Sequence, residues 1–261
     1  MNIKSKLLLA LLATSSAAFA QTAPAAPEVP EVTYNVGVVS QYRYRGLAQT
    51  KGDAALQGGA DYANANGFYA GAWGSTIKWI KETGLDTANN KDIKGPVELD
   101  LYGGYKFEAA GLAYDVGYLR YQYVNNTYNK LGAGYANANT DEVYGAATYG
   151  VLTAKYSYTL SDLFGQDANG GSKHSSYFDL TANFDLGNGY TFAPHAGRQT
   201  VANNASYSYS DYSLTLGKDL GDGLSASVAA VSTTAKNNAL FTVNGYNTAK
   251  NALVVGVKYA F

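Results

Sequence analysis

The sequence predicts a single all-β domain, a twelve-stranded antiparallel up-and-down barrel that crosses a membrane through its strands. Most of the chain alternates apolar with small or polar residues at a period of two, which is typical of strands with one apolar face and one polar face. The 24 Tyr, 29 Gly and single Met favour extended, turn-rich structure over helices. Short and long links alternate between these runs, as in barrels whose long loops gather at one membrane face.

The composition excludes several classes of protein. The 261 residues include no Cys, which rules out disulfide scaffolds and thiolate metal sites. With 19 basic and 20 acidic residues the chain lacks the positive field that nucleic-acid binding requires, so we expect no nucleic-acid partner. No motif for a cofactor, ATP or a metal is present, and we assign no catalytic residue.

Residues 1–20 are predicted to be a cleaved signal peptide. Two lysines precede a short apolar run, and Ala18-Phe19-Ala20 fits the small-residue cleavage rule. The run is shorter than the roughly 18 residues that a membrane-spanning helix needs. Residues 21–31 hold three of the five prolines and are expected to be an extended periplasmic lead-in, which leaves 32–261 for the barrel.

Twelve alternating runs define the expected strands, each near the length that a tilted strand needs to cross a bilayer. Over residues 118–123 the apolar/polar alternation slips by one position, which indicates a bulge in the fifth strand. Pro194 removes a backbone hydrogen-bond donor from the ninth strand. We expect the first strand to pair with the last, and no helix after residue 20. The expected strands are 32–45, 53–62, 68–76, 97–107, 112–124, 141–149, 151–160, 176–186, 190–199, 209–219, 224–233 and 251–261.

Charged side chains fall on the predicted inner face, many of them near the outer mouth. Arg43 and Arg45 end the first strand, and five acids lie at a matching height. Opposed charges across water would create a transverse field that favours dipolar solutes, whereas direct ion pairs would only stiffen the barrel. The expected pore-lining residues are Arg43, Arg45, Glu98, Asp100, Tyr102, Glu142, Lys155, Asp179, His195 and Asp211.

Lower inner positions are mostly Gly, Ser, Thr and Asn, and these small side chains predict a narrow aqueous pore. Lys155 is interpreted either as a pore-lining cation or as one half of a salt bridge. His195 could be a pH-sensitive lining group or a plain hydrogen-bonded histidine, because no carboxylate motif accompanies it in the sequence.

Most tyrosines are predicted to form girdles on the outer face at the membrane interfaces. A sugar-binding track would instead require inward aromatic residues, for which Tyr102 is the best candidate. The expected girdle residues are Tyr42, Tyr44, Tyr62, Tyr69, Tyr105, Tyr114, Tyr158, Tyr190, Tyr212 and Tyr259.

The chain ends in LVVGVKYAF, which places Tyr259 and Phe261 on the lipid-facing side. A terminal aromatic strand resembles the signal by which the outer-membrane assembly machinery recognises its clients. The stretches YNVGVVSQYRYRGLAQT, ALQGGADYANANGFYAGAWGS, ELDLYGGYKF and KYSYTLSDLFG also resemble the TorF family of porins. That resemblance implies a channel in the outer membrane of a Gram-negative bacterium and implies no defined substrate.

The sequence therefore predicts a porin-like, non-enzymatic channel for passive diffusion of small hydrophilic solutes, with weak cation preference. Residues 77–95, the longest outer loop, are the expected plug. The expected partners are outer-membrane lipids and lipopolysaccharide, the assembly machinery and the solutes themselves.

Two alternatives stay open. One is a closed structural or adhesive barrel without transport activity. The other is a phospholipase-like hydrolase that uses His174 and Ser176, although both are expected to face lipid, and Asn188, the candidate orienting amide, lies in the opposite turn.

Overall fold

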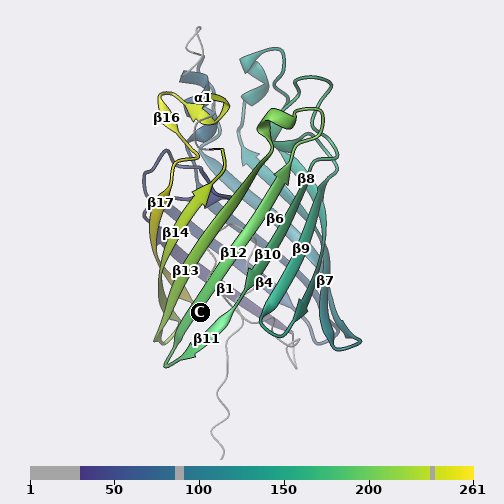
Figure 1. Ribbon diagram of the computed structural model, residues 1–261, viewed down its shortest axis with the longest axis vertical. Helices are drawn as coiled ribbons and strands as arrows, with labels where there is room; N and C mark the ends of the chain where they lie inside the picture. The colour runs from purple at the N-terminus through teal and green to yellow at the C-terminus, as the bar shows by residue number, and fades with distance from the viewer. Residues whose placement is uncertain (1–29, 86–90, 236–238) are drawn as a thin grey trace, which may run out of the picture.

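The computed structural model describes residues 30–85, 91–235 and 239–261, and within them the chain forms a closed antiparallel barrel (Figure 1). The predicted signal peptide lies outside the described residues. The barrel strands are β1 (Glu31–Val39), β4 (Ala55–Ala63), β5 (Phe68–Thr76), β6 (Val97–Ala109), β7 (Leu112–Val124), β8 (Thr140–Tyr149), β9 (Leu152–Thr159), β10 (Ser176–Ala182), β11 (Phe184–Gly187), β12 (Tyr190–Thr200), β13 (Tyr209–Gly221), β14 (Leu224–Thr233) and β17 (Ala252–Ala260). Because β10 and β11 both pair with β12 and form one interrupted strand, the wall has the twelve strands that the sequence predicts.

The first and last strands close the barrel, as predicted. β1 pairs with β17 from Asn35 opposite Ala260 to Val39 opposite Gly256. Beyond this ladder Tyr34 and Phe261 exchange two backbone hydrogen bonds, with N···O distances of 2.8 and 2.9 Å. Each strand of the wall therefore has a neighbour on both sides, and no edge is left for pairing with another chain.

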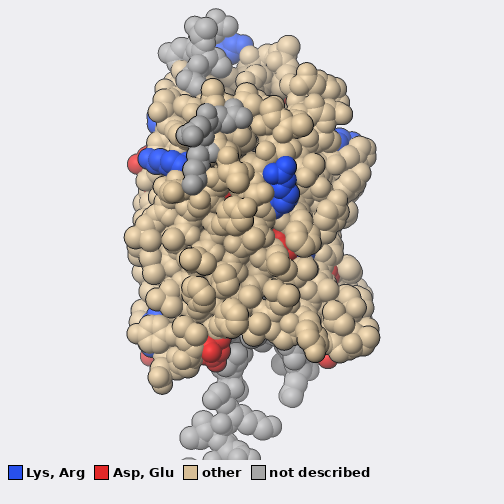
Figure 2. All heavy atoms as spheres, in the orientation of Figure 1, with Lys and Arg blue, Asp and Glu red and all other residues tan. Residues whose placement is uncertain are grey.

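Alternate residues of the strands present an apolar outer surface. Val32, Tyr34, Val36 and Val38 keep 43–52% of their surface exposed, while Thr33, Asn35 and Gly37 between them point inward. Charged atoms are sparse on the wall drawn in Figure 2. This is the surface that a membrane barrel presents to lipid.

The two strands expected to be irregular behave differently. β7 pairs with β6 in continuous register from Leu112 to Val124, so the predicted bulge in the fifth strand is wrong. The odd-numbered residues of β7 face inward throughout. The alternation slips in the sequence because the outward positions 120 and 122 hold the polar residues Arg120 and Gln122. The ninth strand, β12, runs through Pro194 in continuous register with β13, and the interruption lies in the neighbouring strand, at Asn183 between β10 and β11.

The connections segregate as predicted, with short turns at one end of the barrel and long loops at the other (Figure 1). The loop end also carries short elements, and the expectation that no helix follows residue 20 is wrong. These elements are α1 (Trp79–Leu85), β2 (Arg43–Tyr44), β3 (Leu47–Ala48), β15 (Thr242–Val243), β16 (Tyr246–Asn247) and four 3-10 turns, η1 (Tyr128–Leu131), η2 (Leu163–Gly165), η3 (Ala205–Tyr207) and η4 (Ala239–Phe241). Among the described residues, no helix has the length and apolar character needed to cross a bilayer.

Candidate functional site: the occluded lumen

The loop between β1 and β4 enters the barrel, and we call residues 40–54 the plug. β1 ends at Val39, six residues before the predicted end of the first strand, and the chain then folds into the small β2–β3 hairpin. Arg45 and Gly46 form its tip with φ angles of 43° and 79°. Two consecutive positive φ angles are typical of the two-residue type I′ turn that suits a tight hairpin.

One side of the plug packs against β6 and β7. The Tyr42 hydroxyl donates to Glu98 Oε1 at 2.6 Å, and the Tyr44 and Tyr121 hydroxyls are hydrogen-bonded at 2.6 Å. Tyr42 and Tyr44 were predicted to face lipid, but they are 1% and 6% exposed inside the barrel. The prediction is wrong because the alternation of a strand no longer sets their direction once the chain leaves the wall at Val39.

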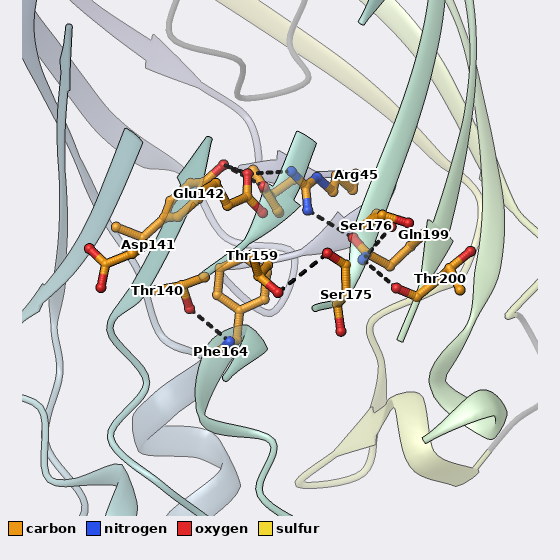
Figure 3. A network of polar contacts seen from close by, with 12 residues as sticks. Arg45, Thr140, Asp141, Glu142, Thr159, Phe164, Ser175, Ser176, Gln199 and Thr200 are labelled. Atoms are coloured by element: carbon orange, nitrogen blue, oxygen red, sulfur yellow. Dashed lines mark hydrogen bonds and ion pairs between the residues drawn. The ribbon is translucent and has the colours of Figure 1, made fainter. Parts of the chain in front are cut away.

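The tip of the plug reaches the opposite part of the wall (Figure 3). Arg45 Nη2 donates to Glu142 Oε2 on β8 at 2.8 Å, and Arg45 Nη1 donates to Gln199 Oε1 on β12 at 2.8 Å. The guanidinium carbon also lies 4.3 Å from the ring centre of Tyr177 on β10. The sequence left two arrangements open, opposed charges across water or direct ion pairs. Arg45 and Glu142 form a direct ion pair.

The remaining contacts of the plug involve the last strands. Arg43 Nη1 donates to the carbonyls of Thr248 and Lys250, at 2.8 and 3.0 Å, just before β17. A Cβ at Gly46 would lie 2.7 Å from Asp211 Cβ on β13 and 3.1 Å from Thr233 Cγ2 on β14. The plug thus touches wall strands around most of the circumference and occupies the lumen at this height. Arg43 and Arg45 are inside the barrel, as predicted, but on the plug instead of the first strand.

Residues 77–95 were the expected plug, but the described residues 77–85 among them lie above residues 40–54 instead of filling the lumen. The backbone N–H groups of Lys78 and Trp79 both donate to the Gln49 carbonyl of the plug, at 2.9 and 3.1 Å. Lys51 Nζ lies 2.7 Å from Glu82 Oε2 on α1. Partial burial disfavours the Glu82 charge, but hydrogen bonds from Lys51 and Asn244 outweigh burial, and the pKa of Glu82 is lowered. We call α1 and its flanking described residues 77–85 the lid.

Beside the plug, the wall is strongly acidic. Glu98, Asp100 and Glu142 are each 1–2% exposed, and Arg45 supplies the ion pair to Glu142. Asp100 Oδ1 and Glu142 Oε1 are buried and have no hydrogen-bond partner among the residues that the structure describes. Burying unpartnered carboxylate oxygens is costly, so this part of the lumen has acceptor capacity that the plug does not use.

A second polar cluster lies on β10, β12 and β13. His195 Nδ1 lies 3.1 Å from Asp179 Oδ2, and Nε2 lies 3.0 Å from Asp211 Oδ2. Tyr177 also donates to Asp211 Oδ1 at 3.0 Å. No carboxylate motif accompanies His195 in the sequence, because its two carboxylate partners come from other strands, β10 and β13. The pairing register, Asp179 opposite Gly197 and His195 opposite Ser213, brings the two acids to either side of His195. No described group of three His, Cys, Asp or Glu is suited to hold a metal ion.

Tyrosine side chains fill space that small residues leave on the neighbouring strands. A Cβ at Gly71 would lie 2.5 Å from the Tyr102 ring, and a Cβ at Gly117 would lie 2.5 Å from the Tyr144 hydroxyl. The Tyr69 hydroxyl donates to Asp115 Oδ1 at 2.6 Å inside the barrel, so the prediction that Tyr69 faces lipid is wrong. Five predicted girdle tyrosines do lie exposed on the outer face: Tyr62, Tyr105, Tyr190, Tyr212 and Tyr259.

The turn-end half of the lumen is more open. Inward Gly37, Ser225 and Ser227 remain partly exposed, unlike the fully buried residues beside the plug. Lys155 also points inward on β9, with Nζ 3.8 Å from the ring centre of Tyr144. Small inner residues thus leave accessible space on the β1–β14 side, while tyrosines fill the other side.

The pair considered for hydrolase chemistry does not form a site. His174 Nδ1 is hydrogen-bonded to the Tyr158 hydroxyl at 2.7 Å. Ser176 shares the outer face with Phe178, which is 46% exposed, and Asn188 lies in a turn at the opposite end of the barrel.

Comparisons with known proteins identify the fold and the family. A family model described as "Bacterial protein of unknown function (Gcw_chp)" matches residues 22–261. No curated protein sequence matches the chain significantly.

Solved porins share the architecture. The KdgM porin has a TM-score of 0.51 at 9% identity and covers 89% of this chain and 99% of that chain. The NanC porin has a TM-score of 0.51 at 12% identity and covers 88% of this chain and 99% of that chain. At such identities the likeness shows the fold alone, and it supports a porin-type barrel without singling out the TorF family. The chain belongs to the bacterial Gcw_chp family of unknown function, and it folds as a porin-type barrel.

Proposed function

We propose that the protein is an outer-membrane channel for small hydrophilic solutes, and that the plug holds it closed in the conformation described here. The observation that carries the proposal is how the lumen is filled. Its outer half is occupied by a loop hairpin, while many of the wall's own inward residues are small. A barrel needed only as a rigid body could fill its interior from the wall, as eight-stranded barrels do. A loop can leave the lumen without breaking a strand.

The rest of the proposal follows from the fold and the outer surface. The exposed apolar side chains of the wall suit contact with lipid, and the end of the barrel that carries the long loops is expected to contact lipopolysaccharide. Phe261 is proposed as part of the signal read by the assembly machinery, after export through the predicted signal peptide. The resemblance to TorF-family porins agrees with this proposal, and no enzymatic activity is proposed.

A closed structural barrel is the second candidate. The buried Arg45–Glu142 ion pair favours it, since breaking such a pair leaves uncompensated charge in the interior. The two candidates differ in whether solutes pass once the plug is absent.

Planar-bilayer recordings of a plug-replaced variant distinguish the two. Val39 and Ala55 are directly paired, so a short Asn-Gly hairpin turn can replace residues 40–54 without altering the wall. We expect stepwise, ohmic conductance from this variant and much smaller or rare openings from the wild type.

A lid-deleted variant lacking residues 77–95 is the matched control. It removes a loop of similar length but leaves the plug contacts with Glu98, Glu142 and Gln199 in place. It should therefore open much less than the plug-replaced variant, although loss of the Lys51–Glu82 ion pair should raise its opening frequency above that of the wild type. A plug-replaced protein that shows heat-modifiable migration but no conductance would establish the structural barrel instead.

A further inference from the structure

Arg45 occupies a site on the wall that has the form of a guanidinium-binding site. We infer that this site recognises guanidinium-bearing solutes, such as basic amino acids, and that Arg45 acts there as an internal competitor of the transported molecule. The inference rests on the proposed channel function and adds a substrate class to it.

The wall supplies three kinds of contact to the Arg45 guanidinium. Glu142 provides a charged acceptor at 2.8 Å, Gln199 provides an amide oxygen at 2.8 Å, and Tyr177 provides a ring face at 4.3 Å. A planar guanidinium can use all three at once, because its N–H groups point along its plane and its face stacks on aromatic rings. An ammonium group has no such planar face, and an anion would be repelled by Glu142.

Two of the three wall residues, Gln199 and Tyr177, are held in place by other residues of the wall. Gln199 Nε2 donates to the Ser176 carbonyl at 3.0 Å, which directs Gln199 Oε1 toward the lumen. The Tyr177 hydroxyl donates to Asp211 Oδ1 at 3.0 Å, which fixes the ring. Gln199 and Tyr177 therefore keep their positions when Arg45 leaves, so an incoming solute meets an amide oxygen and a ring face that are already in place.

The site has more acceptors than Arg45 satisfies. Asp100 Oδ1 and Glu142 Oε1 are buried without partners, and three carboxylates, Glu98, Asp100 and Glu142, line this part of the wall. A free solute that carries an ammonium group beside its guanidinium brings donors and charge that Arg45 alone does not have. Its binding would relieve the cost of the unpartnered oxygens.

The backbone of Arg45 favours exchange. Its φ angle of 43° lies in the left-handed region, which non-glycine residues adopt rarely. Side-chain contacts hold Arg45 in the wall site, so competition for those contacts releases the tip of the plug. The KdgM structure described with oligogalacturonate, a polyanion, provides a contrast, because the acidic wall described here disfavours anions.

Chemical rescue tests the site in the full-length protein. Arg45→Ala should lower the thermal unfolding temperature in detergent, and millimolar methylguanidinium should raise it again, as expected for a ligand that binds the folded state. Methylammonium at equal ionic strength should have little effect, and the wild type should not respond to either ion. An Arg45→Ala protein that responds equally to both ions, or to neither, would overturn the inference and leave Arg45 as a structural bridge.

Flux through the plug-replaced protein provides the second test, and it does not depend on the folding of Arg45→Ala. In proteoliposomes, L-arginine should enter about tenfold faster than citrulline, its neutral isostere, which corresponds to about 1.4 kcal/mol. Glu142→Gln in this background should remove the preference. Glu108→Gln is the matched control, because Glu108 lies exposed at the turn end of β6 and its substitution should leave the preference intact.

The outcomes separate this inference from the channel function. Equal entry of arginine and citrulline through a conducting protein overturns the guanidinium site and leaves the channel standing. Rescue by methylguanidinium together with no flux of any solute overturns the channel, and with it the role in transport, while the binding site stands.

Discussion

Gly46, at the tip of the plug, is a position where a single methyl group should have a large effect. Its φ angle is 79°, and an added Cβ would lie 2.7 Å from Asp211 Cβ. Gly46→Ala should therefore lower the free energy of unfolding by about 1–3 kcal/mol and displace the tip of the plug. Single-channel recording should show more frequent openings than in the wild type.

Gly245 provides the control for this substitution. It occupies the tip of the β15–β16 hairpin with a φ of 73°, but a Cβ added there would have nothing within 4 Å. Gly245→Ala should strain the backbone without displacing the plug, so its open probability should match the wild type. Equal channel opening by both variants would show that contact with Asp211 is not what holds the tip.

His195 is the shared partner of two carboxylates that come from the strands on either side of it. Its nitrogens lie 3.1 and 3.0 Å from Asp179 and Asp211. His195→Ala should lower the free energy of unfolding by about 3 kcal/mol, because the acids lose their common partner. His195→Gln keeps one donor and should fall between the Ala variant and the wild type. Urea unfolding followed by heat-modifiable migration measures the order, and an Ala variant as stable as the wild type would contradict it.

Strand parity predicts most inward residues correctly but does not predict their partners. Asp100, Glu142 and Asp179 face inward as expected, because each sits within a long run of unbroken alternation. Tyr69 was misplaced because it is the second residue of β5, where an amphipathic side chain suits either face. The carboxylates around His195 come from other strands, so they become visible only when the register is known.

The plug and the lid are coupled through the Lys51–Glu82 ion pair, and this coupling predicts a response to acid. The lowered pKa of Glu82 means that its stabilising contribution is present above the ordinary glutamate pKa of about 4.3 and is lost as the pH falls further. Openings should therefore become more frequent at acidic pH. Glu82→Gln should raise the opening frequency at neutral pH and flatten the acid response, as recorded in bilayers buffered at each pH.

Glu31→Gln is a suitable comparison, since Glu31 begins β1 at the opposite end of the barrel. Its acid response should equal that of the wild type. If Glu82→Gln retains the full response, the pH sensitivity lies elsewhere in the barrel.

The expected first strand illustrates why the plug was missed. Alternation continues past Val39 because β2 is itself extended, so periodicity alone cannot locate the point where the chain leaves the wall. One signal was available. The expected run of residues 32–45 is longer than the roughly 9–11 residues that span a bilayer, but this signal is weak, because the expected run 112–124 is nearly as long and stays in the wall as β7.

Closure of the barrel places the chain terminus at the seam between β1 and β17. Phe261 is 59% exposed, stacks on Tyr34 and Tyr259, and is bonded to the Tyr34 backbone. Phe261→Asp should reduce the amount of folded, membrane-inserted protein several-fold, because it alters the terminal aromatic residue expected to be read during assembly. Membrane fractionation and heat-modifiable migration measure this.

Phe107→Asp controls for the cost of placing a charge on the lipid face. Phe107 is a 39% exposed aromatic near the same end of the barrel, within a stack with Tyr105 and Tyr114. A similar loss for both variants would assign the effect to lipid exposure and remove the special role of Phe261.

Sequence periodicity predicts the whole barrel well, including the strand number, the closure and the separation of turns from loops. These properties are local, because each strand is encoded by its own alternation. The filling of the lumen is not local. It depends on Arg45 meeting Gln199, 154 residues away, and no pattern within one strand encodes such a contact.

The partners of the plug also set an order on folding. Arg43 bonds to the carbonyl of Lys250, 207 residues further along the chain, and Gly46 rests against β13 and β14. None of these partners exists until the last third of the chain has joined the wall, and contacts of such long sequence separation form late. The hairpin can therefore complete these contacts only after β13, β14 and the residues before β17 have joined the wall, and until then its tip lacks support on that side.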